Sequence, residues 1–325
     1  MLNKRGSILV ITLWIMAILT ILALGIGFKA SLEVRLSGYN NDSLQAGYLA
    51  KAGLVKAGYF LSKDDKDYDT LRECGVSLDE DQKLQDLFTS ELGRGSFSVD
   101  YTDIEEIEGE EGDTVQIRTI HHGMSDEERK INIRLSVLKT IPDYRIILNN
   151  LGLGERIVDA IENWQNKEPD FPYYERGELV PAYKCRRADF EFVEELRLVE
   201  GVSAELYDDL KDHVTVYGNG KVNINTANPR VLNAIIGEVN VVSDIIDKRT
   251  ADEDYFNNDG IIASYFGDWG SDIERINPEQ YFTAKSDYFR INSRGAVRKV
   301  EKVITAVIKR EPGEDENDIV YYHEH

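Results

Sequence analysis

Cysteine is scarce in this sequence, since its 325 residues include only Cys74 and Cys185. So small a number excludes a disulfide-rich scaffold, and because neither residue lies in a C-x-x-C pair, a structural zinc site is not indicated. The two cysteines fall in different expected domains. Cysteines in an oxidising compartment nevertheless often pair, so a Cys74–Cys185 disulfide is kept as a hypothesis.

Basic side chains are also in short supply. The chain has 38 Lys and Arg against 59 Asp and Glu, a net charge of −21. Such a chain repels nucleic acid and anionic lipid at long range but tolerates cationic partners or divalent ions. The length predicts two domains with ample core, and a composition that is 42% hydrophobic and 30% charged is typical of globular proteins.

Signatures of an enzyme are missing as well. The sequence contains no G-x-S-x-G and no glycine-rich phosphate loop, and Asp208-Asp209 is expected to be a solvated helix face. No two histidines have metal-ligand spacing on one helix; the five are His121, His122, His213, His323 and His325. A signal-anchored enzyme is therefore the less favoured class.

An uncharged apolar run covers Ser7 to Phe28. Its 22 residues would form a helix of roughly 33 Å, enough for one hydrocarbon core. Lys4 and Arg5 precede it, so the positive-inside rule predicts a cytoplasmic N-terminus and an exported remainder. Two alternatives stay open, a cleaved signal peptide with a site near residues 25–27 and a simple uncleaved anchor.

The expected helix continues beyond the membrane. No proline occurs from Lys29 to Leu61, and apolar residues recur there at intervals near three and four, the pattern of an amphipathic helix. Alanine and glycine keep one flank slim, which suits close packing. The sequence therefore predicts one long helix with an apolar half and an amphipathic half.

The remaining segments predict strands around a helical block. Strand patterns occur in FSVDY, TVQIRTI and INIRLSVL, with EEIEGEEGD as a charged hairpin loop, and return in YFRINSRGAV, KVEKVITAVIKR and DIVYY. Two helix–turn–helix units lie between them. We therefore expect an α+β fold, in which a long N-terminal helix packs on a small antiparallel sheet with an inserted all-α, helix-hairpin-helix-like domain. The expected parts are a leader (1–6), a transmembrane helix (7–28), an amphipathic helix (29–62), an α/β part (63–140), the insertion (141–276) and terminal strands with an acidic tail (277–325).

The N-terminal helix resembles the type IV pilin family. In that family a prepilin peptidase cuts after a glycine that follows a basic leader, which implies cleavage between Gly6 and Ser7 here. Pilins usually have Phe or Met first and Glu fifth in the mature chain, whereas this chain has Ser7 and Ile11. The family's Glu is thought to pair with the subunit above, and an unpaired carboxylate in hydrocarbon is costly. A subunit at the tip has no subunit above it to pair with such a Glu. The replacement of Glu by Ile11 is therefore consistent with a tip subunit.

Further motifs narrow the resemblance. DEERKINI, LNNLGL, ENWQNKEPDFPYYERG, FVEELRLVEGVSAELYDDL and VNINTANPRVLNAIIG follow the pilin helix in this order. Together they resemble minor pseudopilin K of the type II secretion system, the general secretion pathway protein K family. The insertion residues that carry the motif are Trp164, Asn223, Asn225, Thr226 and Pro229.

The resemblance implies a non-enzymatic, single-pass inner-membrane protein with a periplasmic soluble region. It implies a place at the pseudopilus tip, where the protein starts or caps assembly for export of folded proteins across the outer membrane. The implied partners are I-like and J-like minor pseudopilins, the inner-membrane secretion platform and the prepilin peptidase. The family also often binds Ca²⁺. Here Gln165, Asn166 and Lys167 replace the acid-rich stretch after Trp164, so the metal ligands stay unknown.

The helix–turn–helix units allow an alternative, an exported helix-hairpin-helix DNA-binding protein of a competence or type IV pilus system. Charge disfavours it. Residues 186–217 hold four bases and nine acids, and residues 222–250 hold three of each. Phosphate binding needs a basic surface, so we expect no nucleic-acid partner.

Overall fold

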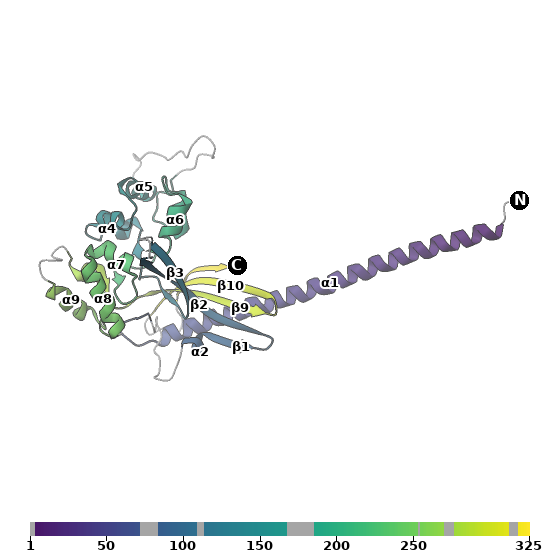
Figure 1. Cartoon of the computed structure of the whole chain (residues 1–325), viewed down its shortest axis with the longest axis horizontal. Coiled ribbons are helices and arrows are strands. Elements are labelled where there is room, and N and C mark those ends of the chain that lie inside the picture. The colour runs from purple at the N-terminus through teal and green to yellow at the C-terminus, as the bar shows by residue number, and fades with distance from the viewer. Residues whose placement is uncertain are drawn as a thin grey trace.

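The chain is described by a computed structural model covering residues 4–71, 84–108, 114–167, 185–252, 254–269, 276–311 and 318–325. It consists of a long rod and a head (Figure 1). The rod is α1 (Lys4–Lys63), a single helix of 60 residues that extends far beyond the head and ends beneath it. The expected continuous helix is confirmed.

The head contains a mixed-length antiparallel sheet. Its strand order is β1 (Thr89–Leu92), β2 (Gly95–Glu108), β9 (Tyr288–Val297), β10 (Val300–Lys309) and β11 (Asp318–Glu324). Two further strands join it, β3 (Thr114–His122) beside β2 and β4 (Ser125–Asp126) beside β9. The β2–β9 pairing joins strands from before and after the helical block. The α+β fold with an insertion is therefore confirmed.

The C-terminal half of α1 packs on one face of this sheet through small residues. Ala46, Ala50 and Ala57 are fully buried. A Cβ atom added to Gly295 on β9 would lie 2.0 Å from the Ala46 carbonyl oxygen, and one added to Gly53 would lie 2.2 Å from Ser293 Oγ. Helix and sheet therefore approach almost backbone to backbone, which explains the alanine and glycine content of this stretch.

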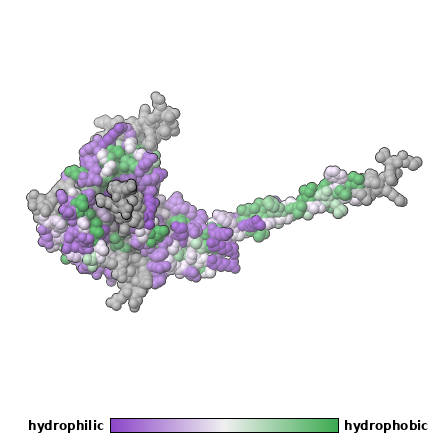
Figure 2. All heavy atoms as spheres, in the orientation of Figure 1, coloured by the Kyte–Doolittle hydropathy of each residue, from purple (hydrophilic) through white to green (hydrophobic). Residues whose placement is uncertain are grey.

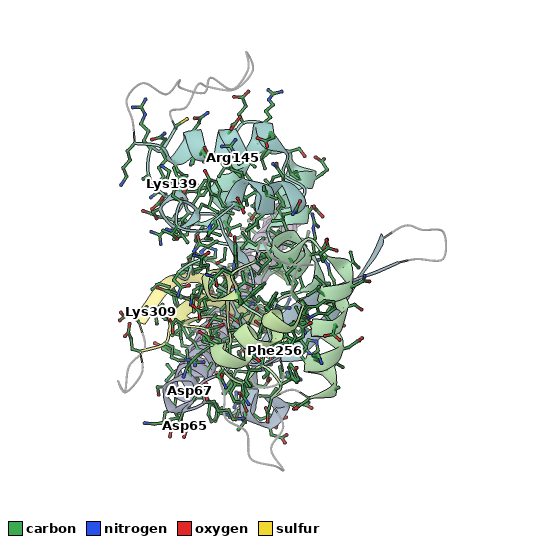
Figure 3. All side chains as sticks on the ribbon, turned by 90° about the vertical axis from the view of Figure 1, so that its left-hand side faces the viewer. Asp65, Asp67, Lys139, Arg145, Phe256 and Lys309 are labelled. Atoms are coloured by element: carbon green, nitrogen blue, oxygen red, sulfur yellow. The ribbon has the colours of Figure 1, made fainter. Side chains whose placement is uncertain are left out.

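The helical unit has its own hydrophobic core. It contains α3 (Leu135–Leu138), α4 (Tyr144–Asn150), α5 (Glu155–Gln165), η1 (Val193–Leu198), α6 (Ala204–Leu210), α7 (Pro229–Ile236), α8 (Val239–Ala251), α9 (Asp259–Asp268) and α10 (Pro278–Tyr281). Two short parallel pairs close it, β5 (Ile131–Asn132) with β6 (Val214–Thr215) and β7 (Val222–Asn223) with β8 (Phe282–Thr283). A short helix, α2 (Leu84–Phe88), precedes β1. In Figure 3, Arg145 of this helical unit lies near one end of the head, and Asp65 and Asp67, which follow α1, lie near the other end.

Local signals set the α7–α8 turn. Asn228 is the N-cap of α7, its side chain accepts a hydrogen bond from Val231 N, and Pro229 follows at the first helical position. The helix ends at Gly237, whose φ of 77° is the left-handed conformation that favours glycine. The predicted helix–turn–helix is confirmed here.

Two local predictions are wrong. The strand expected over INIRLSVL is limited to Ile131–Asn132, because Leu135 and Leu138 are both buried at helical spacing in α3. The loop expected over EEIEGEEGD is wrong in its first part, since Glu105–Glu108 belongs to β2, and residues 109–113 lie outside the described residues.

The core of the helical unit also includes Ile131 and Ala284, outside the expected limits of 141 and 276.

Candidate functional site

The outer part of α1 is uncharged and largely apolar on all sides from Val10 to Phe28. Every residue from Val10 to Asn41 is exposed, including Ile11 at 54%. Figure 2 shows this stretch as a largely hydrophobic rod beside a mostly hydrophilic head. By length and composition α1 can cross a membrane. Lys4, Arg5, Gly6 and Ser7 form its first turns, so the proposed cleavage site lies at the start of the helix.

A second exposed surface lies on the half of α1 that packs on the sheet. Leu44, Tyr48, Val55 and Tyr59 are 58–71% exposed on the helix face away from the buried alanines. Their spacing of four, seven and four residues keeps them on one side of the helix. We call these four residues the α1 stripe. Its apolar, aromatic surface is of the kind that packs against another helix.

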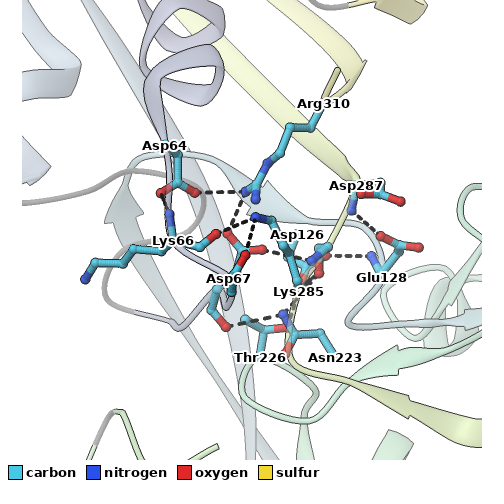
Figure 4. A network of polar contacts seen from close by, with 12 residues as sticks. Asp64, Lys66, Asp67, Asp126, Glu128, Asn223, Thr226, Lys285, Asp287 and Arg310 are labelled. Carbon is cyan, nitrogen blue, oxygen red and sulfur yellow. Dashed lines mark hydrogen bonds and ion pairs between the residues drawn. The ribbon is translucent and has the colours of Figure 1, made fainter. Parts of the chain in front are cut away.

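A buried polar network joins the sheet to the helical unit (Figure 4). Asp126 on β4 accepts hydrogen bonds from Thr226 Oγ1 at 2.6 Å and Ser286 Oγ at 2.7 Å. Asn223 Nδ2 donates to Ser286 Oγ at 3.0 Å and to the Asp69 carbonyl at 3.3 Å. We call this network the junction.

Arg310 ties the end of α1 into the junction. Its Nη2 lies 2.6 Å from Asp69 Oδ1 and 3.2 Å from Asp64 Oδ2, and its guanidinium lies 4.7 Å from the Phe289 ring centroid. Arg310 and both aspartates are almost completely buried. Because Asp64 directly follows α1 and Arg310 directly follows β10, this group holds the helix end against the sheet.

Glu127 forms a second connection. Its side chain is fully buried, contacts Arg290 Nε, and accepts from Lys130 Nζ at 3.2 Å and Thr215 Oγ1 at 2.6 Å. Burial alone would raise its pKa, but the charges of Arg290 and Lys130 outweigh burial and lower the pKa to about 2. Glu127 is therefore a charged group that links β9 to the helical unit.

Three other carboxyl groups at the junction, those of Glu128, Asp69 and Asp126, have raised pKa values because burial disfavours their charged form. Burial, with the charge of Asp126 added, raises the pKa of Glu128 to about 8. Burial also raises the pKa of Asp69 to about 6, although Arg310 opposes it, and raises the pKa of Asp126. The junction thus combines structural ion pairs with carboxyls that favour the protonated state. Most of its groups bond to one another, although Arg310 Nε and Nη1 are buried without a hydrogen-bond partner among the described residues, so its evident role is to hold the two units together.

The motif residues of the insertion have structural roles. Asn223, Asn225 and Thr226 are buried, and Asn225 Nδ2 donates to the Phe256 carbonyl at 3.0 Å. Pro229 starts α7, and Trp164 lies in the core at 3% exposure. Buried side chains cannot reach a phosphate backbone, so the motif gives no support to DNA binding.

Calcium does not fit the described residues after Trp164. Gln165 is buried; its Oε1 accepts from the backbone N–H groups of Leu135 and Phe190, and its Nε2 donates to the Ile133 carbonyl. These hydrogen bonds need an acceptor and a donor on the same side chain. A carboxylate can accept but has no hydrogen to donate, so an acidic residue could not replace Gln165 here. In the described ranges no group of three or more His, Cys, Asp or Glu side chains is placed to hold a metal ion.

The disulfide hypothesis stays a prediction. Cys185 is a buried, free cysteine in the core of the helical unit. Its suggested partner, Cys74, lies outside the described residues.

Sequence reasoning missed the junction itself. The DEERK run supported a family resemblance, but its charged residues gave no sign of burial. Asp69, Arg290 and Arg310 lie 57 or more residues from it. One signal in the sequence could have indicated burial of these charges. The charged run DEERK directly precedes the apolar strand pattern INIRLSVL.

Comparisons with known proteins agree with this architecture. Residues 139–219 match the family described as type II secretion system protein K, and residues 5–55 match the family described as PilX N-terminal. A type II secretion system protein K from Aeromonas hydrophila is 25% identical over 242 residues, which cover 70% of this chain and 68% of the relative. The resemblance to the protein K family is confirmed.

The fold has a solved counterpart. A chain in the crystal structure of the GspK-GspI-GspJ complex from the enterotoxigenic Escherichia coli type 2 secretion system aligns with a TM-score of 0.59 at 14% identity. The alignment covers 90% of this chain and 99% of that chain. At this identity the likeness shows a shared fold, a pilin-like helix and sheet carrying helical insertions. The alternative of an exported DNA-binding protein is not favoured.

Proposed function

We propose that this protein is the K-type minor pseudopilin of a type II secretion system, placed at the tip of the pseudopilus. There it starts or caps assembly with I-like and J-like pseudopilins for the export of folded proteins. The observation that carries the proposal is the α1 stripe. An apolar helix face left exposed beside the sheet needs a partner, and a second pilin-like helix has a complementary shape.

The tip position has two supports. Ile11 occupies the position at which pilins usually carry a glutamate, so α1 gains nothing from a subunit above it. The helical unit adds bulk to the head beyond the sheet (Figure 1), which would obstruct stacking of a further subunit. The role is architectural, and the junction is consistent with it because its polar groups bind one another.

The proposal includes a topology. Lys4 and Arg5 stay cytoplasmic, the outer part of α1 spans the inner membrane, and the head lies in the periplasm. The membrane-distal head is strongly acidic, as expected for a protein without nucleic-acid contacts.

A matched pair of substitutions tests the partner surface. Val55 on the stripe is 71% exposed and Val239 on α8 is 69% exposed, so Val55→Glu and Val239→Glu expose the same charge on equally exposed helical sites. Full-length chains are purified from membranes that also contain the other pilin-like subunits. We expect Val55→Glu to lose those subunits and Val239→Glu to retain them. Equal retention by both variants would contradict the stripe as the contact surface.

Duplex DNA provides the contrast with the alternative function. Filter binding at low ionic strength, where electrostatic attraction is strongest, should show no retention of DNA by the full chain. Tight, salt-sensitive retention would favour the DNA-binding alternative instead.

A further inference from the structure

Two histidines lie side by side at the C-terminal edge of the sheet. The ring centroids of His323 and His325 are 4.2 Å apart, with an angle of 81° between the ring planes. Both residues are exposed. Neither the assembly role nor the junction makes use of them.

The strand register places both rings on the same face of the sheet. Glu324 and Tyr322 pair with Ile304 and Ala306, which are buried in the core shared with α1. Side chains alternate between faces along a strand, so His323 and His325 point to the opposite face from α1. That face is open to solvent at both positions.

The backbone of both residues is held in place. His323 is paired with Thr305 of β10. His325 N donates to the Val303 carbonyl at 2.9 Å, and Val303 N donates to the His325 carbonyl at 3.5 Å. β10 is itself paired with β9 along its whole length. The two imidazoles therefore project from a fixed frame, and only side-chain rotation is needed to bring both rings to one ligand.

We propose that His323 and His325 form a two-histidine binding site for a borderline transition metal ion such as Zn²⁺. Imidazole nitrogen is a preferred ligand for Zn²⁺, Cu²⁺ and Ni²⁺, whereas Ca²⁺ prefers oxygen. With metal–nitrogen distances of about 2.0–2.1 Å and tetrahedral geometry, two rings that share an ion have centroids roughly 5 Å apart. At 4.2 Å the two rings pack edge to face and lie closer than that, so side-chain rotation must move them apart to bring one nitrogen of each to a shared ion.

The site is incomplete by itself. Two imidazoles leave coordination positions open, which water fills in the isolated chain. Among the described strands β11 pairs only with β10, so the positions beside the histidines face outward from the sheet edge. The inference does not rest on the proposed secretion function, since it depends on this strand alone.

Zinc titration of the untagged full chain in detergent tests the proposal by calorimetry. We expect saturable uptake of Zn²⁺ that His323→Asn and His325→Asn each weaken at least tenfold, about 1.4 kcal/mol, and that the double variant loses. Excess Ca²⁺ should not displace the Zn²⁺. His121→Asn is the matched control, because His121 is an exposed strand histidine that stacks on Tyr101 in a different part of the sheet.

The outcomes are distinguishable from misfolding. Both histidines are exposed, so the variants should unfold at the temperature of the parent chain. Absence of saturable Zn²⁺ uptake by the parent would overturn the proposal. So would a double variant that is folded and binds Zn²⁺ as tightly as the parent, or a loss of binding that follows His121→Asn instead.

Discussion

Arg298 Nη1 lies 3.0 Å from Asp42 Oδ2, and this ion pair joins the β9–β10 turn to α1 at the point where the helix leaves the head. Asp42 is the first residue after Val10 that is partly buried rather than exposed. Arg298 adopts a left-handed φ of 55° in this turn. The pair therefore marks the boundary between the supported and the unsupported part of α1.

The helix just before this boundary should open readily. Residues 37–43 read SGYNNDS, and Gly, Ser, Asn and Asp each cost about 0.5–1 kcal/mol relative to Ala in a helix. A Cβ atom added at Gly38 would meet nothing within 4 Å, so packing does not require this glycine. Hydrogen exchange should be fast at 37–43 and slow at 46–57. Gly38→Ala should slow exchange there, and Arg298→Gln, which removes the ion pair to Asp42 without changing the helix sequence, should speed it; uniform protection along α1 would contradict a weak point.

The close contact between helix and sheet gives a second prediction. Gly295→Ala places a Cβ atom 2.0 Å from the Ala46 carbonyl oxygen and 2.5 Å from Ala50 N, both backbone atoms. Overpacking of this kind typically costs about 1–3 kcal/mol, and the free energy of unfolding should fall by that amount. Gly38→Ala is the control, because the same change in open space should not destabilise the head. Chemical denaturation followed by tryptophan fluorescence measures both.

The junction carboxyls predict how stability depends on pH. Raised pKa values mean that the folded head binds protons more tightly than the unfolded chain. Glu128, with a pKa of about 8, and Asp69, with a pKa of about 6, therefore add stability at low pH that is lost as the pH rises through those values. Glu127 has the opposite sign. With a pKa of about 2 it stabilises the head above its ordinary value of 4.5 and loses that effect as the pH falls toward 2.

Denaturation midpoints should therefore be higher near pH 5 than near pH 8. Glu128→Gln keeps an acceptor for Asp287 N and removes the charge beside Asp126, so it should raise stability at pH 8 and flatten the slope between these values. Glu205→Gln serves as a control at an exposed site on α6. A slope that Glu128→Gln leaves unchanged would mean that other groups carry the pH dependence.

The processing site gives a prediction at the other end of the chain. Cleavage between Gly6 and Ser7 would retain α1, so N-terminal sequencing of the membrane form should begin at Ser7. Gly6→Val should block processing, because a β-branched side chain crowds the peptidase cleft. A mature chain that begins at Phe28 would indicate an ordinary signal peptide.

Features set by residues close together in the sequence could be predicted, and features set by residues far apart in the sequence could not. The long helix, the capped α7 with Pro229 and Gly237, and the strand patterns at both ends are local signals, and each was predictable. Strands on both sides of a helical block predicted one shared sheet, but the particular pairing of β2 with β9 is visible only in the structure. INIRLSVL misled because Ile131, Ile133, Leu135 and Val137 alternate as they would in a strand, whereas the helical spacing is carried only by Leu135 and Leu138. The junction was unpredictable for a different reason, since Asp69, Asp126 and Arg310 come together only once the whole head has folded.

The junction also predicts that the two units are coupled. Thr226 Oγ1 on the insertion donates to buried Asp126, so Thr226→Val leaves that carboxyl with one donor fewer, at a cost of about 1–3 kcal/mol. Thr226→Ser retains the hydroxyl and is the control. Deleting residues 144–277 is a less direct test, because it removes the donors Thr215 and Thr226 together with the rest of the insertion. We expect Thr226→Val to lower the single unfolding transition of the whole head, with Thr226→Ser close to the parent. If Thr226→Val instead produced two separate transitions, with the sheet unaffected, the insertion would be an independent domain and the junction only a contact between neighbours.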